Sequence, residues 1–156
     1  MVKAAQERSP GRATSRSVRV GVDLLPVARM ARLAAENPGI QETIFTGLEL
    51  RYCQGKRRAT EHLAARFAAK EAVLKALGTG LGQRMRWTDV EIVNGVLGRP
   101  MVRLYGAVAA WARRAGLSDV DVSLSHTSEL AVAQAVAVWT APPDRPARRR
   151  AAGREG

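Results

Sequence analysis

Residues 61–77 read EHLAARFAAKEAVLKAL, and this stretch decides the fold. Ala, Leu, Lys and Glu are strong helix formers, so we predict a helix from Glu61 to Leu77, with Gly78 as its C-terminal cap. Four apolar residues recur at helical spacing and form one stripe: Leu63, Phe67, Leu74 and Leu77. Lys70 projects within that stripe and Glu71 lies at its edge, so two charged residues stand where a core-facing helix would place apolar ones.

The elements around this helix are expected to be strands and shorter helices. Residues 18–25 alternate Val or Leu with other residues, which is a strand pattern, and a helix is expected from about Pro26 to Glu36. Thr46 with Glu49 three residues on predicts a capping box at the start of another helix. The remaining expected elements are a hairpin, a helix and a second hairpin, over residues 89–93, 101–105, 107–115, 120–125 and 130–139. This order predicts an α+β fold in which an antiparallel sheet packs against the long helix.

Composition and charge bound the possible functions. The chain has 156 residues, of which 46% are apolar, which is enough for one domain with a core. Its formal charge is +11, from 25 Lys and Arg against 14 Asp and Glu. This excess favours an anionic partner such as nucleic acid, a membrane surface, an acidic protein or a phosphorylated small molecule. Residues 1–17 and 141–156 have the composition of disordered basic tails. Each tail contributes +3, so the expected domain, residues 18–140, retains +5.

Several classes are disfavoured by what the sequence lacks. One cysteine, Cys53, permits no internal disulfide, which fits a reducing cytoplasm. A lone cysteine in a helical stretch more often packs in a core than acts as a nucleophile. No apolar run approaches the roughly 20 residues of a membrane span, and residues 1–17 lack the apolar centre of a signal peptide.

Asp23 and Glu71 are the first candidates for chemistry. Taken singly, each has an ordinary explanation, because Asp23 could face solvent at a strand end and Glu71 could form a surface ion pair with Lys75. Taken together, carboxylates from a strand and a helix suit Mg²⁺, which binds one or two protein carboxylates plus waters and phosphate oxygens. Spacing alone leaves both interpretations open.

A glycine-rich segment, Gly78-Thr79-Gly80-Leu81-Gly82, directly follows the helix. Glycines allow the backbone to approach a phosphate or a ribose, but the same residues could simply cap the helix and form a turn. Because the segment follows a helix and does not precede one, it is neither a P-loop nor a dinucleotide-binding fingerprint.

Polar residues also gather where a later strand is expected to end, in Ser123-Leu124-Ser125-His126-Thr127. Adjacent strand residues face opposite ways, so Ser125 and His126 are poorly placed to form a nucleophile–base pair. We interpret His126 as a contact for a phosphate or a metal-bound water, with a turn-capping role as the alternative. His62 and His126 have no matching cysteine and histidine cluster, so no zinc signature is present.

These segments occur in the same order in one protein family. The resembling segments, in one-letter code, are GVDL (21–24), VARM (27–30), IFT (44–46), ARFAAKEA (65–72), KALGTG (75–80), NG (94–95), GRP (98–100) and VSLSHT (122–127). The chain resembles the holo-[acyl-carrier-protein] synthases, the short type of 4′-phosphopantetheinyl transferase, from about Val18 to Trp139. The most specific combination is the lysine–glutamate helix followed by Gly-Thr-Gly, together with the strand aspartate.

The resemblance implies an Mg²⁺-dependent enzyme. Such enzymes transfer the 4′-phosphopantetheine arm of coenzyme A to a serine of an apo acyl carrier protein and release adenosine 3′,5′-bisphosphate. Asp23 and Glu71 match the family's Mg²⁺ ligands, Lys75 matches a catalytic lysine near the diphosphate, and Arg29 matches the carrier-protein surface. The residues that match coenzyme A contacts are Arg66, Lys75, Gly78, Thr79, Gly80, Pro100, His126 and Thr127.

The resemblance also implies a homotrimer whose active sites lie between subunits, with Pro100, His126 and Thr127 reaching the nucleotide from the neighbouring chain. Arg99 departs from the family by standing where lysine is frequent, and both tails exceed the usual family length. The general base and the pathway, fatty acid or polyketide, stay open. The alternative function is a noncatalytic basic module that binds nucleic acid or a carrier protein. Only 4% aromatic residues and no interleaving of basic with aromatic residues disfavour nucleic acid.

Overall fold

The computed structural model describes residues 16–82 and 84–140 of the chain. The main elements follow in this order: β1 (Ser17–Pro26), α1 (Val27–Glu36), α2 (Ile40–Ile44), α3 (Gly47–Gln54), α4 (Ala59–Leu77), β2 (Val90–Asn94), β3 (Pro100–Leu104), α5 (Gly106–Arg114), β4 (Leu117–His126) and β5 (Leu130–Trp139). Two single 3₁₀ turns, η1 (Trp87–Asp89) and η2 (Val96–Gly98), flank β2. The predicted α+β class is confirmed. The expected elements lie close to their predicted ranges, whereas α2 was not expected from the sequence.

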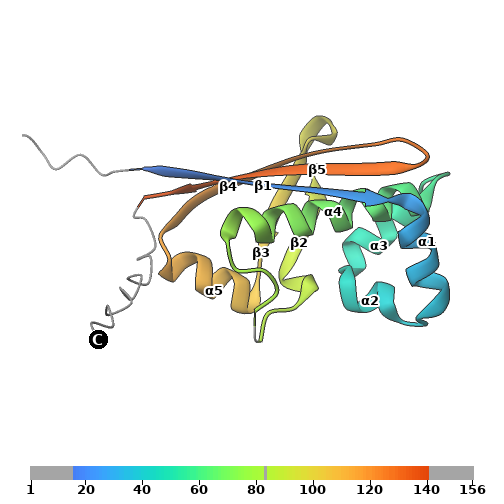
Figure 1. The fold of residues 1–156 in the computed structure, drawn as a ribbon, viewed down its shortest axis with the longest axis horizontal. Coiled ribbons are helices and arrows are strands. Elements are labelled where there is room, and N and C mark those ends of the chain that lie inside the picture. The colour runs from blue at the N-terminus through green and yellow to red at the C-terminus, as the bar shows by residue number, and fades with distance from the viewer. Residues whose placement is uncertain (1–15, 83, 141–156) are drawn as a thin grey trace, which may run out of the picture.

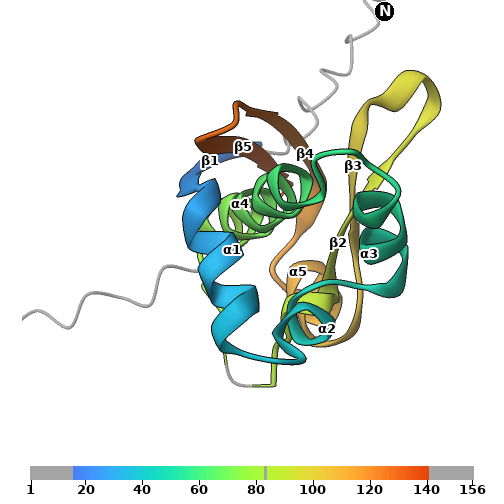
Figure 2. The same ribbon diagram turned by 90° about the vertical axis from the view of Figure 1, so that its right-hand side faces the viewer.

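The strands form two separate antiparallel sheets. One has the strand order β1-β5-β4, and the other is the β2–β3 hairpin. Figure 1 shows the three-stranded sheet as a layer above α4, and Figure 2 shows the hairpin on the side of α4 that lies away from β1. In the larger sheet Asp23 is opposite Ala133 of β5, which is in turn opposite Leu124 of β4. β1 and β4 are therefore the two edges of this sheet.

The long helix α4 is the centre of the fold. The helix has 19 residues, and 14 of them are buried. It is therefore buried on most of its circumference, and not only along the single apolar stripe expected from the sequence. The sheet covers one side of α4, while α1 and α3 and the β2–β3 hairpin pack around the rest (Figure 2). Small residues allow this close approach, because the alanines of α4 face four buried alanines of β5: Ala131, Ala133, Ala135 and Ala137.

Local sequence signals explain where two of the helices begin and end. The capping box predicted for α3 is confirmed, because the Thr46 N–H donates to Glu49 Oε2 at 2.8 Å and the Glu49 N–H donates to Thr46 Oγ1 at 3.4 Å. At the other end of α4, Gly78 has a φ of 79° and its N–H donates to the carbonyl of Leu74. This left-handed conformation favours glycine, which confirms the predicted C-terminal cap.

The two faces of β1 have opposite environments. The apolar residues of its alternating pattern, Val18, Val20, Val22 and Leu24, lie on the outer face of the sheet, and each is more than half exposed. The sequence suggests the opposite, with these residues buried and Asp23 exposed. The other face, with Gly21, Asp23 and Leu25, lies buried against α4. Leu130 and Val132 of β5 extend the exposed apolar face. We call these six residues the outer sheet face: Val18, Val20, Val22, Leu24, Leu130 and Val132.

Two further expectations concern the ends of the domain and membranes. The tails predicted for residues 1–17 and 141–156 lie outside the described residues, apart from Arg16 and Ser17. Ser17 is the first residue of β1 and pairs with Trp139. Within the described part of the chain, none of the helices is both long and apolar enough to cross a membrane.

Candidate active site

Asp23, Glu71 and Lys75 come together between β1 and α4, and we call them the acidic half-site. Lys75 Nζ donates to Asp23 Oδ1 at 2.7 Å and to the carbonyl of Val22 at 3.0 Å. Asp23 is only 8% exposed, and its second carboxylate oxygen, Oδ2, is buried without a hydrogen-bond partner among the described residues. A buried carboxylate oxygen with no donor is unusual, so it is available to a ligand that the protein itself does not supply.

The electrostatics of the acidic half-site reflect two neighbouring carboxylates. Burial raises the pKa of Glu71 most, and the negative charge and closeness of Asp23 raise it further. The positive charges of Lys75 and Arg29 act in the opposite direction. The hydrogen bond to Asp23 raises the pKa of Lys75, so this ammonium group stays charged. A carboxylate whose proton affinity is raised by a neighbouring carboxylate favours a cation between the two.

Both ordinary explanations for the acidic residues are wrong. Asp23 does not face solvent, because the face of β1 that carries it is the one packed on α4. Among the described residues no ion pair joins Glu71 to Lys75; Lys75 pairs with Asp23 instead. The physical cause is Gly21, where an added Cβ would lie 2.0 Å from the carbonyl oxygen of Ala72. Since glycine lets β1 touch α4 there, the next residue on the same face, Asp23, lies beside Glu71 and Lys75 of the helix.

The donor set of the acidic half-site fits a hard divalent cation such as Mg²⁺. Within residues 16–82 and 84–140, no group of three or more His, Cys, Asp or Glu side chains could hold a metal ion. Two carboxylates alone are typical of Mg²⁺, which keeps several waters and takes its other ligands from substrate phosphates. The orphaned Asp23 Oδ2 supplies an oxygen for such a site.

A second cluster surrounds Arg66 on the opposite side of α4. The Arg66 guanidinium stacks on Tyr52 at 4.0 Å, and its Nη2 donates to Asn94 Oδ1 at 2.6 Å. Arg66 is 4% exposed, its Nε has no hydrogen-bond partner, and no described carboxylate lies within ion-pairing distance. Because a buried arginine is normally paired, this one is positioned for an anion.

Two histidines complete this cluster. The His126 ring lies 4.9 Å from the His62 ring, and His126 Nδ1 lies 3.2 Å from Glu61 Oε2. Burial and then the proximity of His126 and the positive charge of Arg66 lower the pKa of His62. These side chains and Pro100 line a cavity of about 350 Å³. We call the cluster the basic half-site: Tyr52, His62, Arg66, Asn94, Pro100 and His126.

Sequence reasoning placed Arg66, Pro100 and His126 in a site but missed Tyr52, His62 and Asn94 as members of it. His62 lies four residues before Arg66 on the predicted helix, so helical spacing could have placed both side chains on one face. Tyr52 carried no such signal, because its contact with Arg66 depends on how α3 packs against α4.

The other predicted site residues take varied positions. Gly78, Thr79 and Gly80 form the turn that ends α4, and Thr79 Oγ1 donates to the carbonyl of Gly80. Thr127 Oγ1 accepts hydrogen bonds from the N–H groups of Glu129 and Leu130, which gives it a turn-stabilising role within this chain. Arg29 lines a cavity of about 430 Å³ between α1, α2 and α4, and this cavity reaches Glu71.

Cys53 is fully buried, and this burial raises the pKa of its thiol to about 11. A thiol that stays protonated at neutral pH is a poor nucleophile, so the packing interpretation of Cys53 is favoured.

One chain does not bring its two half-sites together. His126 is opposite Ala131, and Ala131 is opposite Leu25, so two strand spacings, roughly 10 Å, separate the edge that carries His126 from the edge that carries Asp23. The helix α4 fills the space beneath the sheet between these edges (Figure 2). In a single chain the two half-sites therefore lie on different sides of α4.

The arrangement of a central lysine–glutamate helix under an antiparallel sheet is that of a known class of transferase. A family model described as "4′-phosphopantetheinyl transferase superfamily" matches residues 19–136, and the chain belongs to this superfamily. A holo-[acyl-carrier-protein] synthase from Desulforudis audaxviator is 50% identical over 121 residues, which span 76% of this chain and 91% of the relative. Within the superfamily, the chain is an enzyme of the holo-[acyl-carrier-protein] synthase group.

Solved structures agree with this assignment. The crystal structure of holo-[acyl-carrier-protein] synthase from Neisseria meningitidis has a TM-score of 0.71 at 31% identity, over 76% of this chain and 96% of that one. A synthase from Bacillus anthracis, solved in complex with "CoA (3′,5′-ADP)", has a TM-score of 0.66 at 32% identity, over 80% of this chain and 99% of that one.

Proposed function

We propose that this protein transfers the 4′-phosphopantetheine arm of coenzyme A to a serine of an apo acyl carrier protein, with Mg²⁺ as the cofactor and adenosine 3′,5′-bisphosphate as the other product. The observation that carries the proposal is the acidic half-site, in which a buried Asp23 with an orphaned oxygen lies beside Glu71 and Lys75. The presence of coenzyme A in the Bacillus anthracis relative supports the same co-substrate here.

Each residue of the acidic half-site has a distinct task in this reaction. Asp23 and Glu71 would hold Mg²⁺, which when bound supplies positive charge to the diphosphate of coenzyme A. Lys75 is held by Asp23 and by the carbonyl of Val22, so its ammonium group has a fixed position from which to neutralise the leaving phosphate. Positioned charges of this kind do most of the catalytic work in phosphoryl-type transfer.

The basic half-site would bind the nucleotide end of coenzyme A. This end carries a 3′-phosphate, and the buried Arg66 guanidinium has a free Nε and no described acidic partner. The Tyr52 and His62 rings supply flat apolar surface beside it, while His126 and Pro100 line the same cavity. Further proposed contacts are Gly78, Thr79 and Gly80. They form the turn directly after the end of α4 that carries Lys75, and their glycines would let a ligand approach the backbone.

A homotrimer would unite the two kinds of half-site. Because the half-sites lie on opposite edges of one sheet, a ring of identical chains can place the acidic half-site of each beside the basic half-site of the next. The outer sheet face supports this assembly, because its six apolar residues form a patch that is exposed to solvent in a single chain. Exposed apolar patches often mark contacts between proteins. Pro100, His126 and Thr127 would then reach the nucleotide from the neighbouring subunit.

The carrier protein would dock at α1. Arg29 and Arg32 stand at the cavity of about 430 Å³ that leads to Glu71, so a serine presented there would approach the acidic half-site. Carrier proteins of this enzyme group are acidic, and the +5 charge of residues 18–140 would steer the encounter. The cytoplasmic location inferred from the single cysteine stays a prediction, and the pathway stays open.

Mass spectrometry of several apo-carrier proteins, incubated with coenzyme A, Mg²⁺ and this protein, tests the proposal. We expect one carrier to gain the mass of one phosphopantetheine arm, and expect Asp23→Ala and Glu71→Ala to abolish the gain while circular dichroism stays native. Glu42→Gln, which changes an exposed glutamate of α2, is the matched control and should transfer normally. No mass gain on any carrier, together with salt-dependent DNA binding, would favour the noncatalytic alternative.

A further inference from the structure

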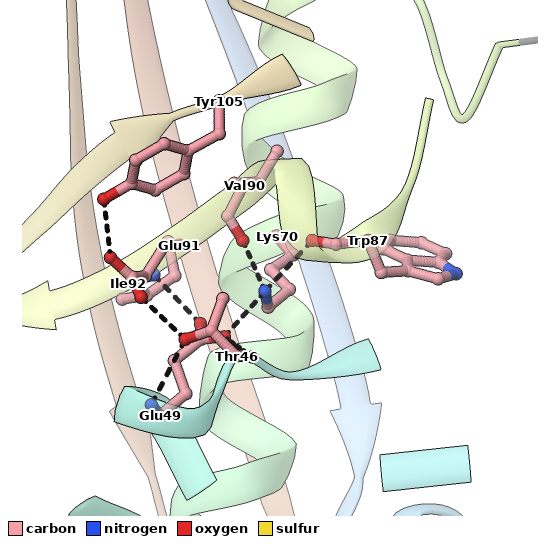
Figure 3. A network of polar contacts seen from close by, with 8 residues as sticks. All are labelled: Thr46, Glu49, Lys70, Trp87, Val90, Glu91, Ile92 and Tyr105. Carbon is pink, nitrogen blue, oxygen red and sulfur yellow. Dashed lines mark hydrogen bonds and ion pairs between the residues drawn. The ribbon is translucent and has the colours of Figure 1, made fainter. Parts of the chain in front are cut away.

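Lys70 is the most completely buried charged residue of the fold, and the chemistry above does not use it. Its side chain is 0% exposed, and its Nζ contacts three acceptors from three different segments. These are Glu49 Oε2 at 2.8 Å, the carbonyl of Trp87 at 3.1 Å and the carbonyl of Val90. Figure 3 shows this ammonium group between α3, η1 and β2.

The contacts extend beyond Lys70 into a continuous network (Figure 3). Glu49 Oε1 accepts the Ile92 N–H at 2.9 Å, and Glu49 Oε2 accepts the Thr46 N–H at 2.8 Å. The Thr46 hydroxyl donates to Glu91 Oε1 at 2.7 Å, and the Tyr105 hydroxyl donates to Glu91 Oε2 at 3.0 Å. We call this set the Lys70 network: Thr46, Glu49, Lys70, Glu91 and Tyr105.

Stability alone does not explain a buried ion pair at this position. Removing two charges from water opposes folding, and apolar residues of similar size often serve a core equally well or better. Lys70 lies within an apolar stripe where leucine or methionine would satisfy packing. What the ion pair adds is direction, because in the observed orientation of α4 the Nζ atom contacts acceptors on three different segments that surround the helix.

That orientation of α4 determines where both half-sites lie. Glu71 follows Lys70 by one residue, which is about 100° around the helix, and so is directed toward β1. Arg66 precedes Lys70 by four residues and lies on the same side, toward β2 and Asn94. A rotation of α4 by about 10° would move a side-chain tip about 6 Å from the axis by roughly 1 Å. Misplacement on that scale can lower an enzyme's rate about 100-fold.

We infer that Lys70 is a positioning residue, whose network with Glu49 fixes α4 so that Glu71 faces Asp23 at metal-binding distance. The inference rests on the proposed function, because it takes Glu71 as a metal ligand. Glu49 shares the role, since its two oxygen atoms join the Lys70 ammonium group to the start of α3 and to β2.

The test is the double variant Lys70→Met/Glu49→Gln of the full chain, which removes both charges and leaves an acceptor for the Ile92 N–H. Mn²⁺ replaces Mg²⁺, and its affinity is measured by electron paramagnetic resonance with coenzyme A present, at a temperature where circular dichroism shows a native fold. We expect the dissociation constant for Mn²⁺ to rise about tenfold and kcat to fall by at least as much. Leu63→Ala, a cavity variant on the same helix without polar contacts, is the control and should lower Tm with Mn²⁺ affinity unchanged.

A double variant that folds and binds Mn²⁺ within about twofold of the native protein would overturn the inference, because the network would then serve stability only. If the double variant does not fold, Glu49→Asp keeps the charge but withdraws the carboxylate by one methylene. It should weaken Mn²⁺ binding about threefold, and unchanged binding would again overturn the inference. A native protein that binds no Mn²⁺ and modifies no carrier overturns the proposed function first, so the two failures are distinguishable.

Discussion

At the scale of single residues, the acidic half-site is a place where two negative charges meet. Asp23 is buried and paired with Lys75, while Glu71 lies next to both. Such an arrangement is unfavourable in the metal-free protein and favourable once a cation is present, because the cation removes the repulsion between the carboxylates. The proposed cofactor ligands should therefore weaken the fold when no cofactor is bound.

The raised pKa of Glu71 predicts how the stability of the metal-free protein changes with pH. Because burial and Asp23 raise the pKa in the folded state, the stabilising contribution of Glu71 is complete below its ordinary pKa and is lost as pH rises through the raised value. We expect the Tm of Glu71→Gln relative to native protein to increase between about pH 4 and about pH 7 in metal-free buffer. Calorimetry in a chelator measures this difference, and Glu42→Gln is the control. A difference that is independent of pH would contradict the assigned cause.

At the scale of elements, the site depends on how closely β1 approaches α4. Gly21 has no room for a side chain, since an added Cβ would lie 2.0 Å from the Ala72 carbonyl oxygen and 2.5 Å from the Ala76 nitrogen. Both neighbours are backbone atoms, which cannot move without shifting the helix. The strand would have to leave the helix, and Asp23 would leave with it.

Gly21→Ala should therefore lower the free energy of unfolding by about 3 kcal/mol and weaken Mn²⁺ binding in the same protein. Gly39→Ala is the matched control, because an added Cβ there meets nothing within 4 Å and only the φ of 82° opposes it. We expect Gly39→Ala to lower the free energy of unfolding by about 1 kcal/mol and to leave the Mn²⁺ affinity unchanged. Urea denaturation measures both, and equal losses in the two variants would argue against close packing at Gly21.

At the scale of the whole molecule, the outer sheet face and the separated half-sites support the proposed homotrimer. Val22→Glu places a charge on that face, where Val22 is 52% exposed in the single chain. We expect light scattering after size-exclusion chromatography to show dissociation to monomers and transfer activity to fall with it. Glu42→Gln on α2, at an exposed position away from the sheet, should leave the assembly intact. If the Val22→Glu protein kept the native assembly size, the outer sheet face would not be part of the subunit interface.

Sharing of active sites between subunits predicts complementation. Glu71→Ala disables the acidic half-site and His126→Ala disables the basic one, so each variant alone should be inactive. After unfolding and refolding together in equal amounts, about a quarter of the sites should combine two intact half-sites, because each half is intact with a probability of about one half. Mass spectrometry of the carrier protein measures the recovered rate. Mixtures as inactive as their components would show that each chain builds its own site.

The sequence by itself determined the features that depend on near neighbours along the chain. These include the long helix with its glycine cap, the capping box at Thr46, the order of strands and helices, and the selection of Asp23 with Glu71 as candidates. Each follows from spacing or from hydrogen bonds within a few residues.

Only the tertiary structure decided which face of β1 is buried, because alternation reveals two faces but not which one meets the helix. The valine face proved to be the exposed one, since Gly21 allows α4 to approach from the other side. The pairing of Lys75 with Asp23, the gathering of Tyr52 and His62 around Arg66, and the separation of the two half-sites were likewise decided there. These contacts join elements that are distant in sequence, and packing, which local patterns do not encode, sets their positions.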